Sequence, residues 1–132
     1  MYHKHASFRR AFFACLLIGV FLSGCTSSKS VSTKNFKSLG TASYYADKFN
    51  GKKTASGEKF SNGKMTTAHK TLPLGTQVKV TNTANGKSVK VKVNDRGPFT
   101  KNRELDLSKK AFMKITDNKN HGTLKVRIEI VN

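Results

Sequence analysis

Hydrophobic and polar residues alternate with a period of two along several short stretches of this chain. The pattern is clearest over residues 77–81 and 88–93, where every second residue is a valine. Such alternation is typical of β-strands that bury one face. Asn85-Gly86 lies between the two stretches and favours a tight turn, since both residue types tolerate positive φ. The pattern therefore predicts a β-hairpin over residues 77–93.

Weaker signals extend this picture to a mainly β domain. Residues 124–131 alternate again, residues 39–46 alternate less strongly, and residues 51–64 hold three glycines and few apolar side chains, as loops do. A second short helical turn is expected near residues 66–69. Short strands, frequent turn signals and one or two small helices predict a compact closed barrel.

One longer helix is expected over residues 108–115. Ala111, Phe112 and Ile115 would fall on one face of it, and either Asp106 or Ser108 could cap its first turn. Because the preceding Leu107-Ser108 opens this helix, Asp106 is interpreted as a structural residue rather than a catalytic one.

The N-terminal part of the chain has the composition of an export signal. A basic segment without acids is followed by an apolar run over residues 11–22, which is too short to span a bilayer. Leu22-Ser23-Gly24-Cys25 resembles a bacterial lipobox, in which the cysteine is lipidated; an ordinary cleaved signal is the alternative. The expected organisation is a signal at 1–24, a lipidated Cys25 and Ser/Thr/Lys-rich tether at 25–38, and one domain at 39–132.

Cysteine content and charge narrow the class of protein. Cys15 would leave with the signal and Cys25 would carry lipid, so the domain would hold no disulfide and no thiolate metal site. Removing Lys4, Arg9 and Arg10 leaves 22 basic against 7 acidic residues, a net charge of +15. For an exported protein, this charge favours weak attraction to anionic envelope polymers rather than binding to nucleic acid.

Three polar residues of catalytic type lie in separate turn-rich segments: Glu58, His69 and Asp95. Loops held by a small barrel suit the binding of an extended polymer, and we expect a polysaccharide. No cofactor is expected. A metal site is not expected either, because His69 and His121 lack the spacing of metal ligands.

An ordered series of five motifs runs through the domain: Gly40-Thr41-Ala42-Ser43-Tyr44-Tyr45, Thr54-Ala55-Ser56-Gly57-Glu58-Lys59-Phe60, Thr67-Ala68-His69-Lys70-Thr71-Leu72-Pro73-Leu74-Gly75-Thr76, Asn94-Asp95-Arg96-Gly97-Pro98-Phe99 and Asp106-Leu107-Ser108. Together these motifs resemble the rare lipoprotein A family of peptidoglycan-active proteins. The resemblance implies a six-stranded double-psi β-barrel from Gly40 to Val131 and lytic transglycosylase activity in the members that are enzymes. It also implies activity-bearing positions that match Glu58, His69 and Asp95.

The chemistry assigns provisional roles to the three residues. Cleaving a glycosidic bond needs a carboxylic acid to protonate the leaving oxygen, and Asp95 is our candidate for that acid and for the later base. Glu58 would assist or orient substrate, and His69 would hydrogen-bond a carboxylate or a sugar. The structural alternatives are a turn-capping or arginine-paired Asp95, a buried His69 that satisfies a loop, and a Glu58 on plain surface.

Substrate contacts are expected from Tyr44, Tyr45 and Arg96. One tyrosine would stack on sugars and the other would pack in the barrel wall, while Arg96 would clamp the structure or contact a substrate carboxylate. Relative to the family pattern, Tyr45 replaces a tryptophan and Ser61 replaces an aspartate. These departures keep open an expansin-like module that binds peptidoglycan without cutting it, and also a protein that docks onto or inhibits another envelope protein.

The expected location is the cell envelope, through the lipid on Cys25. Thr26 after the cysteine resembles an outer-membrane sorting signal if the host has two membranes; otherwise the outer face of the plasma membrane is expected. The partners would be peptidoglycan glycan strands and the membrane, and the protein would be a monomer.

Overall fold

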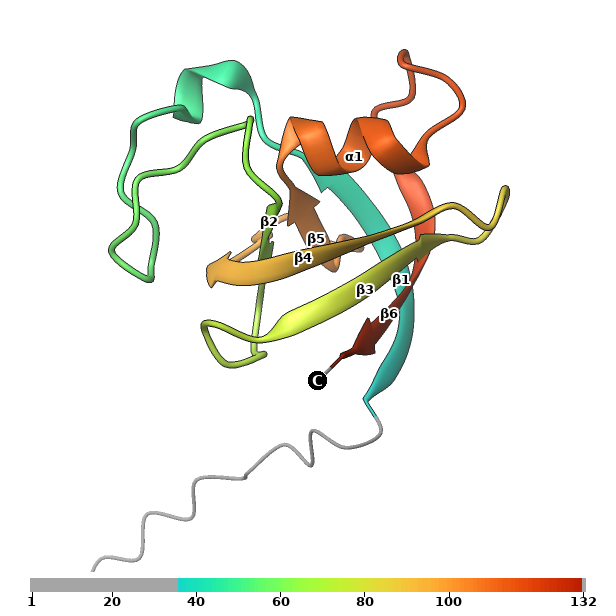
Figure 1. Ribbon diagram of the computed structural model, residues 1–132, viewed down its shortest axis with the longest axis horizontal. Coiled ribbons are helices and arrows are strands. Elements are labelled where there is room, and N and C mark those ends of the chain that lie inside the picture. The colour runs from blue at the N-terminus through green and yellow to red at the C-terminus, as the bar shows by residue number, and fades with distance from the viewer. Residues whose placement is uncertain (1–35, 132) are drawn as a thin grey trace, which may run out of the picture.

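The computed structural model describes residues 36–131, whose strands close into a six-stranded β-barrel (Figure 1). The expected signal, the lipidation site Cys25 and most of the tether lie outside the described residues. No helix within residues 36–131 is long and apolar enough to cross a bilayer. The strands are β1 (Lys37–Tyr44), β2 (Thr66–His69), β3 (Gln77–Asn82), β4 (Ser88–Asp95), β5 (Leu105–Leu107) and β6 (Leu124–Ile130).

The strand order around the barrel is β1-β5-β2-β4-β3-β6. The pairs β1/β5 and β2/β4 are parallel, and the other four neighbours are antiparallel. The predicted six-stranded barrel is thus confirmed, as is the hairpin, which pairs Val80 with Val89 across β3 and β4. At the turn, Gly86 takes a φ of 74°, a left-handed conformation that glycine adopts without strain.

The alternating residues meet inside the barrel. Valines of β3 and β4 and the apolar residues of β5 and β6 form one buried cluster. Because every second side chain points outward, the same strands carry polar residues on the solvent side. The fully buried members of the cluster include Val78, Val80, Val93, Leu105, Leu107, Val126 and Ile128.

Helix α1 (Lys109–Ile115) covers one end of the barrel, as Figure 1 shows. Its buried residues are Ala111, Phe112 and Ile115, as the apolar spacing predicts. Ser108 caps the helix, since its hydroxyl accepts a hydrogen bond from the Ala111 amide. Asp106, the other candidate cap, instead lies within β5.

Two local expectations differ from the structure. Residues 66–69 form strand β2 rather than a helical turn, because they pair with both β4 and β5 and all four are buried. Strand β1 begins at Lys37, two residues before the expected domain boundary at Leu39, because Lys37 and Ser38 pair with β6.

The long segment between β1 and β2 contains a short 3-10 helix, η2 (Asp47–Phe49), followed by the expected loop. Buried Asn62 ties this loop to the barrel. Its side-chain amide donates to the Tyr45 carbonyl (3.2 Å) and to Asp47 Oδ1 (2.9 Å), and its carbonyl oxygen accepts from the Lys109 amide. The loop is therefore anchored against η2 and α1 and forms one wall of the pocket described next.

Candidate functional site

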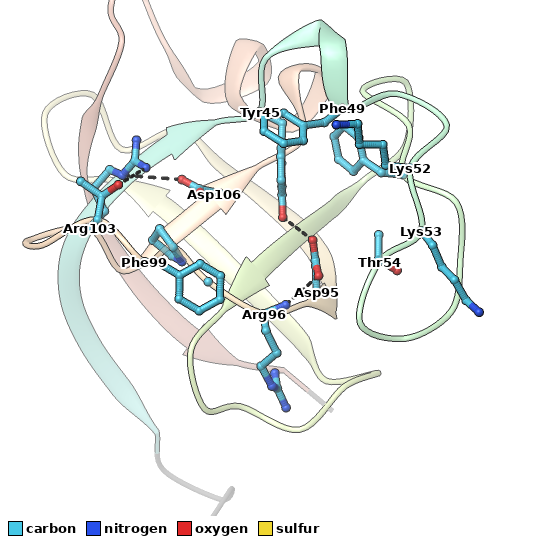
Figure 2. Close-up of a pocket in the computed structure, with 14 residues that line it drawn as sticks. Tyr45, Phe49, Lys52, Lys53, Thr54, Asp95, Arg96, Phe99, Arg103 and Asp106 are labelled. Atoms are coloured by element: carbon cyan, nitrogen blue, oxygen red, sulfur yellow. Dashed lines mark hydrogen bonds and ion pairs between the residues drawn. The ribbon is translucent and has the colours of Figure 1, made fainter.

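A pocket of about 440 Å³ opens between the 46–60 segment and the 96–103 loop (Figure 2). Aromatic rings, basic side chains and two carboxylates share its lining, a combination that suits a polar, ring-shaped ligand such as a sugar. The lining residues are Tyr45, Phe49, Lys52, Lys53, Thr54, Phe60, Asp95, Arg96, Gly97, Pro98, Phe99, Thr100, Arg103 and Asp106.

Three neighbouring strands bring the two carboxylates to the same place. Ala68 of β2 pairs with Asp95 of β4 on one side and with Asp106 of β5 on the other. The two aspartate Cα atoms are thus two strand spacings apart, about 10 Å. A register shift between Thr67 and Ala68 sets the alignment of β4 at this point. The barrel itself therefore fixes the positions of both acids.

Asp95 is held by donors from three segments. The Tyr45 hydroxyl donates to Asp95 Oδ2 (2.6 Å), and the Ala55 and Arg96 amides each donate to Oδ1 (2.9 Å). Figure 2 shows the carboxylate and the tyrosine hydroxyl pointing toward each other. The orientation of the Asp95 carboxyl group is thus fixed by donors from the loop, from the end of β4 and from the residue after β1.

The two tyrosines have different surroundings. The Tyr44 ring packs on Phe112 of α1, with the ring centroids 4.7 Å apart, against the barrel core. The Tyr45 ring lies in the pocket, with its centroid 4.3 Å from that of Phe60. Burial is the largest cause that raises the pKa of Tyr45, and the hydrogen bond to Asp95 is the second. The hydroxyl therefore keeps its proton and can donate it to a hydrogen bond with Asp95.

Asp106 lines the pocket, although its place in the sequence predicted only a structural role. Its carboxylate accepts a hydrogen bond from the Ser43 hydroxyl and lies 3.8 Å from Arg103 Nε. Because Leu105 and Leu107 are buried in the core, the alternation of β5 turns Asp106 to the outer, pocket side. The apolar-polar-apolar pattern of these three residues is the signal that could have identified it.

Glu58 does not line the pocket. Its carboxylate pairs with Lys92 Nζ at 2.8 Å, and the hydrogen bond from Lys92 holds the pKa of Glu58 below its usual range. Its backbone carbonyl accepts from the Thr54 amide (2.8 Å), which closes the turn that presents Ala55 to Asp95. Glu58 therefore supports the loop beside the acid, and a catalytic role for it stays a prediction.

His69 is buried at the end of β2 and is absent from the pocket lining. Its Nδ1 accepts hydrogen bonds from the Thr71 amide (3.1 Å) and the Leu72 amide (3.0 Å). Burial lowers the pKa of His69, which favours the neutral ring that these two donors require. The geometry is that of a histidine ordering the 70–72 turn, and its catalytic role also stays a prediction.

Arg96 combines a structural contact with a place at the pocket. Its guanidinium donates from one nitrogen to the carbonyls of His69 (3.2 Å) and Leu72 (2.7 Å). In Figure 2 the guanidinium extends away from Asp95, although the adjoining backbone donates to that carboxylate. Arg96 thus links the 69–72 turn to the strand end that carries Asp95.

The edge of the pocket supplies groups that sequence reasoning did not single out. Phe99 is 92% exposed, which is unusual for a phenylalanine and suits a ring that stacks on a ligand. Phe49 lies on the far side with Lys52 Nζ 5.2 Å from its ring centroid. Within residues 36–131, no group of three or more His, Cys, Asp and Glu side chains could hold a metal ion.

Comparison with known proteins identifies the family and supports the barrel fold. Residues 37–128 match a family model described as lytic transglycolase, a double-psi β-barrel family, which confirms the predicted resemblance. The chain is 56% identical over 104 residues to an endolytic peptidoglycan transglycosylase RlpA of Rickettsia felis (76% of this chain, 45% of that protein). It is 52% identical over 94 residues to the protein of the same name from Neisseria meningitidis serogroup A (71% and 39%).

The chain spans less than half of the length of these two relatives. Among solved structures, it resembles a Streptomyces papain inhibitor with a TM-score of 0.58 and 25% identity, covering 74% of this chain and 96% of that one. An apo expansin from Clavibacter michiganensis gives a TM-score of 0.58 at 24% identity, covering 74% and 51%. The expansin likeness supports the shared barrel fold.

Proposed function

The chain belongs to this lytic transglycolase family, and from that premise we propose that it is a peptidoglycan lytic transglycosylase. It would cleave the glycan strand between N-acetylmuramic acid and N-acetylglucosamine and leave 1,6-anhydro-N-acetylmuramic acid ends, as part of cell wall remodelling. The observation that carries the proposal is the Asp95 carboxyl group, oriented by three hydrogen-bond donors at the wall of a sugar-sized pocket.

One carboxyl group can perform both proton transfers of this reaction. Asp95 would donate its proton to the glycosidic oxygen, and the bond from that oxygen to the anomeric carbon breaks with its electron pair going to the oxygen. The 6-hydroxyl oxygen of the same muramic acid then attacks the anomeric carbon, and its proton returns to Asp95. No water is consumed, and the acid is regenerated.

Tyr45 keeps the acid in place through this cycle. A carboxyl oxygen has two lone pairs, so Asp95 Oδ2 can accept from the Tyr45 hydroxyl with one of them while the other holds the proton that passes to the glycosidic oxygen. The raised pKa of Tyr45 means that the phenol does not ionise in competition with the aspartate. The Ala55 amide fixes the other carboxyl oxygen, which leaves the group little freedom to turn.

Asp106 offers a second negative charge in the same pocket. Cleavage passes through a transition state with positive charge at the anomeric carbon, which a fixed carboxylate stabilises. The hydrogen bond from Ser43 and the nearby Arg103 hold Asp106 in the orientation seen in Figure 2. We therefore assign Asp106 to charge stabilisation and Asp95 to proton transfer.

The pocket edge suits the substrate. The exposed ring of Phe99 would stack on a sugar, and the rim lysines Lys52 and Lys53 would meet the carboxylates that muramic acid or its stem peptide carries. Aromatic stacking with a few placed charges is a common way to hold carbohydrate polymers.

In the cell, this domain would be held at the envelope by a lipid on Cys25. The motif at residues 22–25 supports that anchor, and Thr26 supports the outer membrane, facing the periplasm, where two membranes exist. In a host with one membrane, the domain would face outward from the plasma membrane. We propose that it acts there as a monomer.

The reaction is tested by digesting purified sacculi in water enriched in ¹⁸O and identifying the released fragments by mass spectrometry. A lytic transglycosylase yields anhydro ends without the label, whereas a hydrolase yields reducing ends that carry it. The protein would span residues 26–132, which include every described residue of the closed barrel. Labelled reducing ends would overturn the proposed reaction.

The Asp95→Asn variant is the matched control, because it removes the transferable proton and changes the side-chain shape very little. It should release anhydro ends about 10³-fold more slowly at the same enzyme concentration. Sacculi that bind the wild-type protein but stay intact would instead leave a wall-binding module that does not cut.

A further inference from the structure

The outer surface of β1, β6, β3 and β4 is strongly cationic. These four strands are consecutive neighbours in the closed barrel (Figure 1). Their outward residues include six basic residues, of which Lys92 is paired with Glu58. We call this surface the basic face; it comprises Lys37, Lys79, Lys90, Lys125 and Arg127.

Strand register places these charges side by side. Lys79 lies directly opposite Lys90 on one side and opposite Glu129 on the other. Like charges in directly opposed positions destabilise a sheet, so this arrangement costs stability unless an anion neutralises it. The arrangement therefore favours a bound anionic partner.

The basic face has few acidic groups of its own. Among residues 36–131, Glu129 is its one carboxylate, and it pairs with Lys37 at 3.5 Å. No ion pair to an acid is found there for Lys79, Lys90, Lys125 or Arg127, although Lys125 Nζ donates to the Thr41 hydroxyl (2.9 Å).

A large apolar side chain lies within this charged surface. Leu39 is 73% exposed and is paired in register with Arg127. Shallow hollows lie on both sides of it, one reaching Lys125 and the other lined by Lys37 and Arg127. An exposed leucine surrounded by cations matches a surface that presents negative charge above an apolar layer, as a lipid bilayer does.

The position of the face in the chain and in the barrel fits the same partner. Twelve peptide units separate Cys25 from Lys37, so an anchor at Cys25 would hold the start of β1 within about 40 Å of the membrane. In the strand ring, β3 and β6 stand opposite β5 and β2, which carry Asp106 and its pairing partner Ala68. A membrane against the basic face would therefore leave the pocket side turned away from the lipid.

We propose that the basic face is a docking surface for anionic lipid headgroups, with Leu39 entering the interface between them. Docking orients the barrel so that the pocket faces the cell wall. The proposal uses the proposed lipid anchor only as the reason that a membrane is near; the charge pattern and Leu39 carry the rest.

The test measures vesicle binding by the unlipidated chain of residues 26–132, so neither the anchor nor the glycan reaction contributes. Sedimentation with phosphatidylglycerol vesicles should capture the wild-type protein, and phosphatidylcholine vesicles should not. The variant Lys79→Gln/Lys90→Gln/Lys125→Gln/Arg127→Gln should bind at least tenfold more weakly, because each basic residue near an anionic surface adds several-fold to affinity.

The matched control loses the same four charges from exposed lysines elsewhere: Lys64→Gln/Lys110→Gln/Lys114→Gln/Lys119→Gln. It should retain most of the binding. Equal losses in the two variants would show that overall charge alone drives binding and would overturn the proposal, as would a failure of the wild-type protein to bind phosphatidylglycerol.

Leu39→Ser separates a lipid surface from a soluble polyanion. It leaves the charge unchanged and should weaken vesicle binding at least threefold. If Leu39→Ser has no effect and soluble polyphosphate binds as well as the vesicles do, the partner is a dissolved polyanion and the lipid proposal fails.

Discussion

The two sides of the barrel are built on different patterns, although they share one core. On β6, Leu124, Val126 and Ile128 are buried while the residues between them are exposed. On β2, across the ring, all four residues are buried, and three of them are polar. The regular side gives an outer surface rich in lysine and arginine, whereas the irregular side, together with the end of β4, gives a pocket with two carboxylates. The contrast suggests that chemistry is located where the alternation is interrupted.

The largest expected effect is on the rate of catalysis, and it distinguishes Asp95, which lines the pocket, from Glu58, which does not. Asp95→Asn should lower the rate of anhydro-end release from sacculi by about 10³-fold, since general acid–base catalysis contributes about 10²–10⁴-fold. Glu58→Gln makes the same chemical change outside the pocket and should keep the rate within about tenfold of wild type. Equal losses in the two variants would move Glu58 into the catalytic site.

A smaller effect distinguishes the two neighbouring tyrosines. Tyr45→Phe removes the hydroxyl that donates to Asp95 and should slow release about tenfold, as expected for one hydrogen bond to a charged group. Tyr44→Phe is the matched control, because Tyr44 makes no side-chain hydrogen bond within residues 36–131. Similar rates for the two variants would contradict the role of the Tyr45 hydroxyl.

The buried histidine should make stability depend on pH. Burial lowers the pKa of folded His69, so below about 6.5 the unfolded chain takes up the proton first. The free energy of unfolding therefore falls as the pH drops from about 6.5 toward the lowered pKa of His69 in the folded protein. Above a pH of about 6.5 the His69 contribution is fully present.

Urea denaturation at about pH 7.5 and about pH 5 measures this loss. His69→Gln keeps an acceptor for the Thr71 and Leu72 amides but does not titrate, so its stability should fall less on acidification. His69→Ala should cost about 1–3 kcal/mol at about pH 7.5, because it leaves the amides unpaired. The cost relative to wild type should be smaller at about pH 5, where the wild type has already lost part of the His69 contribution. An unchanged pH dependence in His69→Gln would contradict this reading.

The smallest effect is expected on the regular side. Lys90→Gln removes one of two directly opposed lysines and should raise the free energy of unfolding by a few tenths of a kcal/mol at low salt. Lys119→Gln, in the exposed turn after α1, should leave stability unchanged. Thermal melts at low and high salt compare them, and a destabilised Lys90→Gln would show that the paired lysines do not repel.

The sequence predicted the regular side well for a physical reason. Alternating valines specify both the strands and the buried face, so the β3–β4 hairpin and β6 could be located with few errors. Ser108, Phe112 and Ile115 likewise predicted the helix and its cap. The local sequence pattern is sufficient to predict an element where residues close in the sequence determine its structure.

The pocket side could be predicted only in part. Asp95 and Tyr45 were identified through motifs, but β2 and β5 are too short for a period to be recognised, and both are stabilised by pairing with distant strands. Asp106 was therefore interpreted as a helix cap. Its position beside Asp95 depends on Ala68, which no local pattern links to either residue.

The pocket should cut glycan without any contribution from the basic face. This division is measured as the rate of anhydro-end release from soluble glycan strands, without membranes, by three proteins: wild type, Asp95→Asn and the quadruple basic-face variant. We expect Asp95→Asn to lose activity and the basic-face variant to stay within about twofold of wild type. A basic-face variant as inactive as Asp95→Asn would instead show that this surface belongs to the glycan-binding site.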